Sequence, residues 1–283
     1  IISRTLSNLV KKNAVLRFNF TSILKLIYIF VHVVRVKKYK YFFFLFLISI
    51  KKKWYRAIFL DHLINEIHLF YYKKFNPNFS VVFFNAAAHI QHHYFLLKEK
   101  NSQKNLIPSW YIDKSNDPFK DVVISYDALL ENYINQNKND FDLIVTTGLT
   151  QTPVKRPTFY WKIKKYDVFL DFFNIKYSEI RQLMSRDFVI YFKNSEEVVK
   201  NFYILNNIYI FNKKIQKKEK AFKILKKRKN SIFVTLTYPS NIETEDFFVY
   251  KKKKLNMKNN TEFVAIKNGE HHSEGYFFTN ITN

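Results

Sequence analysis

Apolar residues recur at helical spacing through the N-terminal part of the chain. Within 21–74, residues such as Trp54 and Ile58 follow a period of three to four positions, and Asp61 and Asn65 fall on other faces of the same pattern. An apolar stripe with polar residues opposite is typical of a helix that packs one side against a core. We therefore predict helices over most of 21–74.

Three short apolar runs have the length and composition of buried strands. They occupy 79–84, 143–145 and 263–266, and each is bounded by polar or turn-forming residues. An amphipathic helical pattern over 121–137 stands between the first two runs. Alternation of helices with short, continuously apolar strands is typical of parallel βαβ units, whose strands are buried on both faces. The pattern therefore predicts an α/β fold with a mostly parallel sheet flanked by helices.

Two prolines, Pro153 and Pro157, mark a change in the pattern. Beyond them strand-like runs mix with helical stretches, and the basic stretch 213–230 is expected to be a solvated helix or loop. We expect 155–258 to form a smaller α+β insertion or cap. The other boundaries are then 1–154 for an α/β core with a helical N-terminal region and 259–283 for the return to that core.

The chain is strongly basic, with 47 Lys and Arg against 23 Asp and Glu and a formal charge of +24. Such a charge is a feature of nucleic-acid-binding proteins. Two observations weaken that interpretation: the lysines are spread along the chain, and the residues used most have AT-rich codons, so codon bias alone raises the lysine count. There are no cysteines, so any metal ion has to be held by His, Asp, Glu or Asn.

The apolar runs near the N-terminus are short for a transmembrane helix. The most apolar one, 41–50, has ten residues, whereas a membrane span needs about 20. These runs favour buried helices, or helices that lie at a membrane interface. Residues 1–18 lack the apolar region of a signal peptide. We expect a cytoplasmic location, with association at the inner-membrane surface left open, and, since the sequence begins with Ile1, an N-terminally incomplete chain.

Five of the eight histidines lie in two places. His89, His92 and His93 follow the first predicted strand, and His271 and His272 follow the last. In open α/β sheets ligands bind beyond the carboxyl ends of the strands, so the two groups are expected to meet at one rim. On a helix, residues three and four apart share a face, and neutral imidazoles on one face can hold zinc. The alternative is that these side chains only pack against neighbouring loops.

Three segments that contain these residues resemble blocks of bacterial alkaline-phosphatase-superfamily proteins. The blocks belong to relatives of the nucleotide pyrophosphatase/phosphodiesterases, some of them encoded among surface-polysaccharide genes. The segments read FFNAAAHIQHHY over 83–94, LIVTTGLTQ over 143–151 and AIKNGEH over 265–271. The resemblance covers about 50–283. It implies a three-layer α/β fold that is only partly contained in this chain.

The same resemblance implies roles for individual residues. In the superfamily, the first block carries an Asp and, four residues later, a His on one metal ion, and the last block supplies another His to that metal. The implied metal ligands here are His89 and His271, with His92 and His93 as phosphate donors or general acids. The implied substrate-binding residues are Asn85, Thr146, Thr147 and Gln151.

The sequence departs from the superfamily pattern at two places. Asn85 occupies the position of the metal-binding Asp, and Gly148 and Leu149 replace an Asp-His pair that serves a second metal. The superfamily's nucleophilic Ser or Thr lies upstream of the matching segments. Whether the chain is an enzyme therefore stays open at this point.

The sequence leads to three functional hypotheses. The first is a metal-dependent phosphoesterase or phosphodiesterase that acts on nucleotide-sugar or glycan phosphates in polysaccharide biosynthesis, with zinc, or alternatively manganese, as its cofactor. The second is a catalytically degenerate relative that binds a phosphorylated glycan without cleaving it. The third, favoured only by the net charge, is a basic nucleic-acid-binding protein.

Overall fold

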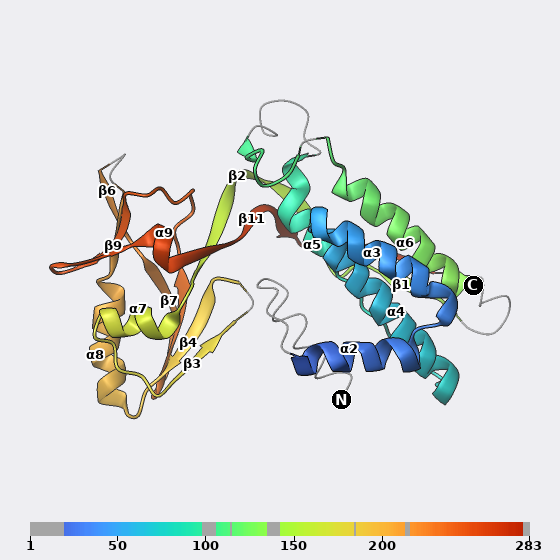
Figure 1. Cartoon of the computed structure of the whole chain (residues 1–283), viewed down its shortest axis with the longest axis horizontal. Helices are drawn as coiled ribbons and strands as arrows, with labels where there is room; N and C mark the ends of the chain where they lie inside the picture. The colour runs from blue at the N-terminus through green and yellow to red at the C-terminus, as the bar shows by residue number, and fades with distance from the viewer. Residues whose placement is uncertain are drawn as a thin grey trace. The chain divides into compact units, whose positions relative to one another are not determined.

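The computed structural model describes residues 20–97, 106–113, 115–134, 142–183, 185–212 and 216–279. The chain divides into two compact units (Figure 1). We call Thr158–Ile266 the β-rich unit, and Asn19–Pro157 together with Lys267–Asn283 the helical unit. Residues 1–19, the start of the first predicted domain, lie outside the described residues.

The β-rich unit contains two four-stranded sheets, with strand orders β3-β4-β8-β7 and β10-β9-β5-β6. Neighbouring strands in both sheets run antiparallel. The strands are β3 (Glu179–Gln182), β4 (Asp187–Tyr191), β5 (Tyr209–Asn212), β6 (Lys217–Lys220), β7 (Phe222–Lys227), β8 (Ser231–Leu236), β9 (Asp246–Tyr250) and β10 (Lys253–Asn256). The turn between β9 and β10 has only two residues, and one of them, Lys251, has a left-handed φ of 52°. Such short connections can join only antiparallel strands.

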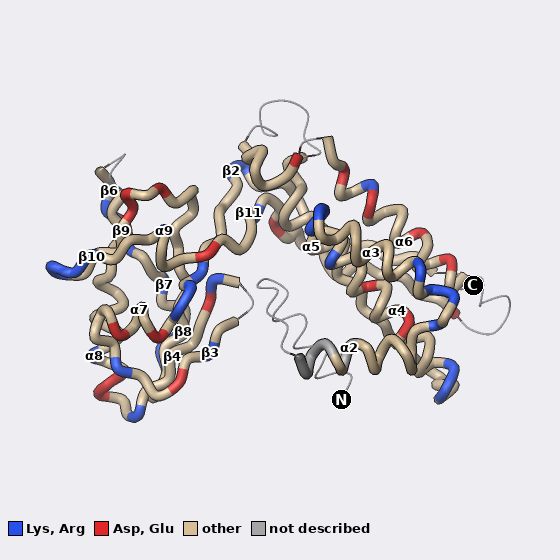
Figure 2. Tube along the Cα trace, in the orientation of Figure 1, with Lys and Arg blue, Asp and Glu red and all other residues tan. Residues whose placement is uncertain are grey.

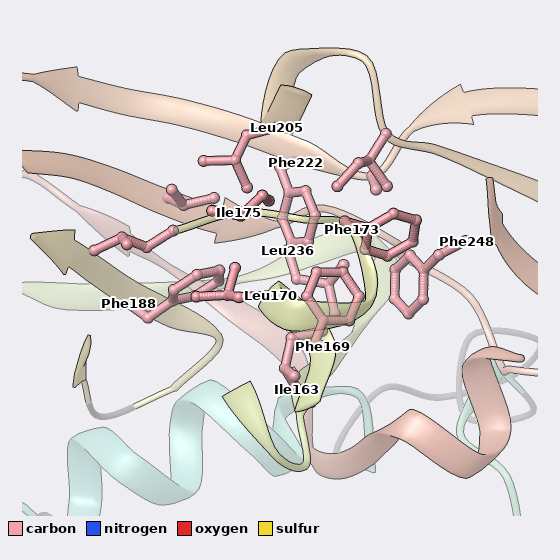
Figure 3. Close-up of a cluster of buried hydrophobic side chains, with 14 of the residues drawn as sticks. Ile163, Phe169, Leu170, Phe173, Ile175, Phe188, Leu205, Phe222, Leu236 and Phe248 are labelled. Carbon is pink, nitrogen blue, oxygen red and sulfur yellow. The ribbon is translucent and has the colours of Figure 1, made fainter. Parts of the chain in front are cut away.

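Three helices complete this unit: α7 (Tyr166–Phe172), α8 (Ser195–Asn206) and α9 (Met257–Asn260). The side chain of Asn194 accepts a hydrogen bond from the Glu197 N–H at the start of α8, which satisfies one of the free donors of the first turn. The core between the elements is rich in phenylalanine (Figure 3). Rings from α7, β7 and β9 meet there, since Phe169 lies 5.7 Å from Phe222 and 5.1 Å from Phe248 between ring centroids.

The helical unit is built around α4 (Tyr55–Phe75), which contacts α2, α3, α5 and α6. This helix ends where Asn76 adopts a left-handed conformation (φ 40°), one residue before Pro77. The other helices are α2 (Phe20–Val33), η2 (Val36–Lys38), α3 (Tyr39–Lys51), α5 (Ala86–Tyr94), η3 (Phe95–Leu97) and α6 (Pro118–Ile134). The helices predicted over 21–74 are confirmed. The helix predicted over 121–137 is present as α6, which begins three residues earlier, and 135–137 lie outside the described residues.

Two further strand pairs are present. The short strands β1 (Ile144–Thr146) and β12 (Phe277–Thr279) pair antiparallel, and β2 (Thr150–Ile163) pairs with β11 (Thr261–His272). The unit boundaries at 157/158 and 266/267 fall inside β2 and β11. The histidine-bearing end of β11 and the start of β2 therefore belong to the helical unit.

The predicted three-layer, mostly parallel sheet is wrong. The described strands form sheets of two to four strands, and the pairs with defined register are antiparallel. The apolar run 79–84 lies in none of these sheets, and the basic stretch 213–230 contains β6 and β7 where we predicted a helix or loop. A short apolar run fixes neither the direction nor the partner of a strand, which explains the error.

No described helix combines the length and the apolar character that a membrane span requires.

Candidate functional site

The helix that carries three of the histidines is positioned by a buried carboxylate. Asp61, on α4, accepts hydrogen bonds from the backbone N–H groups of Asn85 (3.1 Å) and Ala86 (2.7 Å) at the start of α5. Tyr126 donates to the same carboxylate (2.9 Å) and accepts from the N–H of Ala87 (3.0 Å). The first N–H groups of a helix have no partner within it, and negative charge is favoured at this end. Asp61 thus fixes where α5 begins.

Asp61 illustrates a signal that the helical pattern contained and that we misinterpreted. We placed Asp61 and Asn65 on faces other than the apolar one, yet both residues are 1% exposed. Burial raises the pKa of Asp61, although the three hydrogen bonds to its carboxylate act in the opposite direction. Four polar residues that lie one, four and five positions from Asp61, or are Asp61 itself, share one face of this helix and are all buried. This spacing was the sequence signal of a buried polar network: Asp61, His62, Asn65 and Glu66.

Histidine side chains of α5 and β11 meet at one place in the helical unit. The rings of His92 and His271 lie 4.6 Å apart between centroids, at an interplanar angle of 86°. His93 lies 4.6 Å from His89 and 6.3 Å from His92, so the four rings form a continuous series. We call His89, His92, His93 and His271 the histidine centre. His271 is inside β11, whereas the sequence suggested that it follows the strand.

A glycine allows β11 to come close to α5. A Cβ atom on Gly269 would collide with the carbonyl oxygen of Gln91 and would lie 3.1 Å from the side-chain oxygen of Gln151. The carbonyl of Gly269 in turn contacts Nδ1 of His92 at 3.2 Å. This close approach brings the residues of β11 to the histidine-bearing face of α5, and no residue with a side chain fits at position 269 without displacement.

The side chain of Asn268 joins the same two elements. It accepts a hydrogen bond from the N–H of Phe95 (2.5 Å) and donates one to the carbonyl of His93 (2.6 Å). The residue is fully buried, at 0% exposure. Because a buried amide must be satisfied at both ends, this arrangement holds the C-terminal end of α5 against β11.

Gln151, at the start of β2, lies against both α5 and β11. Its side-chain nitrogen donates to the carbonyl of Ala88 at 3.1 Å. Its side-chain oxygen is buried and has no hydrogen-bond partner among the described residues. An unsatisfied buried acceptor is costly in a folded protein, and it is a group that a ligand or a protonated imidazole can satisfy.

The imidazoles of His89 and His92 are held towards their neutral form. Loss of water lowers the pKa of His92, with smaller contributions from the charges of His271 and Lys267, while the hydrogen bond to Gly269 acts in the opposite direction. Desolvation and then the charge of His92 lower the pKa of His89 to about 4. One side of His89 remains exposed to solvent. Neutral imidazoles have a lone pair that can bind a metal ion.

The other predicted substrate residues are placed differently. Asn85 is the N-cap residue of α5, but its side chain makes no capping hydrogen bond. Thr146 and Thr147 lie beside Tyr276, the residue just before β12: Oγ1 of Thr147 accepts from the N–H of Tyr276 at 2.9 Å, and Oγ1 of Thr146 lies 3.3 Å from the Tyr276 carbonyl. The hydrogen bonds described for Thr146 and Thr147 thus lead to Tyr276 and to their own backbone rather than to the histidine centre.

A second polar cluster lies between α4 and its neighbours. Glu66 is 3% exposed and forms a two-pronged ion pair with Arg35, at 2.8 Å from Nε and 2.5 Å from Nη2. Nε2 of His62 contacts the hydroxyls of Tyr41 (3.0 Å) and Ser125 (2.9 Å). Burial lowers the pKa of His62 to about 4. These partners are structural, because the groups are enclosed between helices.

Among the described residues, no group of three or more His, Asp or Glu side chains is already arranged around a metal position. The histidine centre offers pairs of imidazoles in contact: His89 with His93, and His92 with His271. A metal ion would therefore need a third ligand from a side-chain rotation, from solvent or from its own substrate.

No protein-family model matches the chain, and neither a curated protein nor a solved structure matches it. A functional proposal for this chain therefore rests on the geometry of the described residues.

Proposed function

We propose that the histidine centre binds a divalent cation and, with it, the phosphate group of a phosphorylated small molecule or glycan. One observation carries the proposal. His92 and His271 are 179 positions apart in the chain, since 271 − 92 = 179, yet their rings lie 4.6 Å apart. The half-buried ring of His92 and the exposed ring of His271 come from two different elements, and a ligand shared by both accounts for their meeting at the surface.

The hydrogen bond of His92 supports a cation as that ligand. When Nδ1–H of an imidazole donates to a backbone carbonyl, here that of Gly269, the lone pair is on Nε2 and the orientation of the ring is fixed. Metal-binding histidines typically have such a partner. Zinc is the first candidate and manganese the second, because imidazole nitrogen is the only donor type that the centre supplies in number.

The structure suggests a division of roles within the centre. The sequence paired His89 with His271 as metal ligands, whereas the ring in contact with His271 is that of His92. We assign the cation to His92 and His271, and we assign His93 and His89 to the phosphate or to a proton transfer. Gln151 would accept a hydrogen bond from the bound ligand through its unpaired side-chain oxygen.

Phosphoester hydrolysis is the reaction that this proposal includes. A cation bound there would polarise a phosphoryl oxygen and offset its charge. His93 would hold or donate a proton at the leaving oxygen. The likeness of the segments 83–94, 143–151 and 265–271 to alkaline-phosphatase-superfamily proteins supports this class of substrate. We propose a relation through those segments only, since the sheets of this chain are small and antiparallel.

Binding without hydrolysis is the second candidate. Gly148 and Leu149 replace an Asp-His pair that the superfamily uses for a second metal, and Asn85 has no carboxylate to offer the first. A centre with one cation site and no nucleophile among the described residues fits a protein that recognises a phosphorylated glycan. Turnover separates the two candidates.

Zinc binding by the whole chain tests the proposal. Isothermal titration with zinc, with manganese as the second metal, should show one site whose affinity falls at least about tenfold in His271→Ala and in His92→Ala, because each removes a ligand. His272→Ala is the matched control. Its side chain points to the other face of the strand, and its Nδ1 lies 3.8 Å from Glu274.

Equal zinc affinity in the wild type, His271→Ala and His92→Ala would contradict the proposed cation site. A loss in His89→Ala but not in His92→Ala would restore the pairing that the sequence suggested. Hydrolysis of bis(p-nitrophenyl) phosphate by the zinc-loaded chain, lost in His93→Ala, would select the enzyme over the binding protein.

The location also remains a proposal. We propose a cytoplasmic protein with a surface that contacts the inner membrane, and fractionation of cells that express a tagged chain would test it. A tagged chain found only outside the cytoplasmic and membrane fractions would contradict this proposal.

A further inference from the structure

The outward face of α3 is apolar, although it is exposed to solvent. Phe42, Leu45 and Ser49 face the neighbouring helices and are buried. The opposite side of the same helix carries large apolar side chains that are 47–64% exposed: Phe43, Phe44, Phe46, Leu47 and Ile50. A surface helix normally carries polar residues on its outward side, and a contiguous apolar patch on a protein surface marks an interaction site. We call these five residues the α3 face.

Lysines flank the α3 face at both ends of the helix. Lys37, Lys38 and Lys40 are at its N-terminal end, and three more, Lys51, Lys52 and Lys53, are at its C-terminal end (Figure 2). Residues 1–60 contain no Asp or Glu, although the chain as a whole has 23 acidic residues. The first carboxylate along the chain is Asp61, which is buried against the start of α5. The charged side chains that residues 37–53 contribute around the α3 face are therefore all basic.

The dimensions of α3 suit a helix that lies on a membrane. It has 13 residues, which corresponds to a length of about 20 Å at 1.5 Å per residue, whereas the hydrocarbon core of a bilayer is about 30 Å thick. Helices with aromatic and leucine side chains on one side and lysines at the boundary lie in the plane of the interface. Anionic headgroups attract such lysines, at about 1 kcal/mol for each residue near the surface.

We infer that the α3 face docks onto the surface of an anionic lipid bilayer. Phe43, Phe46 and Leu47 enter the boundary between headgroups and acyl chains, and the lysines at the two ends of α3 bind the lipid phosphates. A protein partner could also cover the apolar side chains, but only an acidic partner would complement the six lysines, whereas an anionic bilayer complements both features. This inference does not rest on the histidine centre.

Sedimentation of the full chain with lipid vesicles tests the inference. The chain should bind mixed phosphatidylcholine–phosphatidylglycerol vesicles, and binding should weaken in high salt and be much weaker with phosphatidylcholine alone. The double variant Phe43→Ser/Leu47→Ser should bind at least about tenfold more weakly, because it removes two inserted side chains. Lys51→Gln/Lys53→Gln should also lose about tenfold, but only with anionic vesicles.

A matched control comes from an exposed apolar pair elsewhere. Val199 and Tyr203 on α8 are 58% and 63% exposed, and Val199→Ser/Tyr203→Ser should bind vesicles as the wild type does. The lysine variant keeps the core intact, so it remains informative if the serine variant fails to fold. The variant His92→Ala/His271→Ala should retain vesicle binding, which separates this inference from the proposed function.

Three outcomes would overturn the inference. The first is a wild-type chain that stays in solution with anionic vesicles. The second is equal binding of the wild type and Phe43→Ser/Leu47→Ser. The third is a chain that self-associates through the α3 face, detected as a concentration-dependent dimer that Phe43→Ser/Leu47→Ser abolishes while vesicle binding is absent.

Discussion

The phenylalanine core of the β-rich unit and helix α3 of the helical unit differ in how their aromatic side chains are exposed. In the β-rich unit, the phenylalanines of two sheets and a helix enclose one another, and Phe169, Phe188 and Phe248 are at most 1% exposed. In the helical unit, polar residues are buried around α4 while Phe43 on α3 is 64% exposed. All eight histidines of the chain belong to the helical unit. The histidine centre and the α3 face, on which our two proposals rest, thus both belong to the helical unit.

The largest expected effect concerns the core of the β-rich unit. Phe169→Ala should lower the free energy of unfolding of that unit by about 3–5 kcal/mol, because the ring is fully buried and the cavity is lined by other rings. Urea-dependent hydrogen exchange of peptides from 158–266 measures this loss. Phe43→Ala is the matched control, and it should change stability by no more than about 0.5 kcal/mol. Equal losses of unfolding free energy in the two variants would show that Phe43 is buried in solution.

The next effect concerns the contact between α5 and β11. Gly269→Ala should cost up to about 3 kcal/mol in the helical unit, because the added Cβ would collide with a backbone oxygen that cannot rotate away. It should also shift the ring NMR signals of His92 and His271, since the hydrogen bond to the Gly269 carbonyl is displaced. Gly148→Ala is the control, because a Cβ there meets no atom within 4 Å. Unchanged histidine signals in Gly269→Ala would contradict the close approach.

A smaller effect should make the helical unit sensitive to acid. Burial lowers the pKa of His62 to about 4, whereas an unfolded histidine titrates near about 6.5. Below about 6.5 the unfolded chain gains a proton that the folded chain does not accept. The stabilisation is therefore complete above about pH 6.5 and is lost as the pH falls towards 4, with about 2 kcal/mol lost between pH 7 and pH 5.

The variant His62→Gln isolates this contribution. It should show a smaller loss of unfolding free energy between pH 7 and pH 5 than the wild type, measured by urea unfolding at both pH values. The charges that act on His62 are those of Lys38, which lowers its pKa further, and Glu66, which raises it. The β-rich unit contains no histidine, so it should show no loss of this origin. An identical pH dependence in the variant and the wild type would refute the assignment.

Elements with a strong local signal were predictable from the sequence. The helices within 21–74 follow directly from spacing and composition, and they are present. The helix predicted over 121–137 is also present as far as the described residues extend. These features depend on residues close together in the chain, which is why a single sequence reveals them.

Features that depend on distant residues were not predictable. The direction of the strands follows from the short turns and from pairing across the sheet, and an apolar run such as 79–84 contains neither. The burial of Asp61 follows from the start of α5, which lies 24 positions further on, since 85 − 61 = 24. We expected the two groups of histidines to meet, but at the rim of a parallel sheet that the structure does not contain. The contact of His92 with His271 depends on the close approach at Gly269, and nothing in the sequence distinguishes that role from the roles of the other two glycines.

The most direct test of the histidine centre is paramagnetic broadening by Mn²⁺ in the isotope-labelled full chain. A cation held between α5 and β11 should broaden the amide signals of 89–93 and of 269–271 together, at the same metal concentration, and zinc should reverse the effect. Broadening of only one of these two segments, or broadening confined to carboxylates elsewhere in the chain, would contradict a shared site.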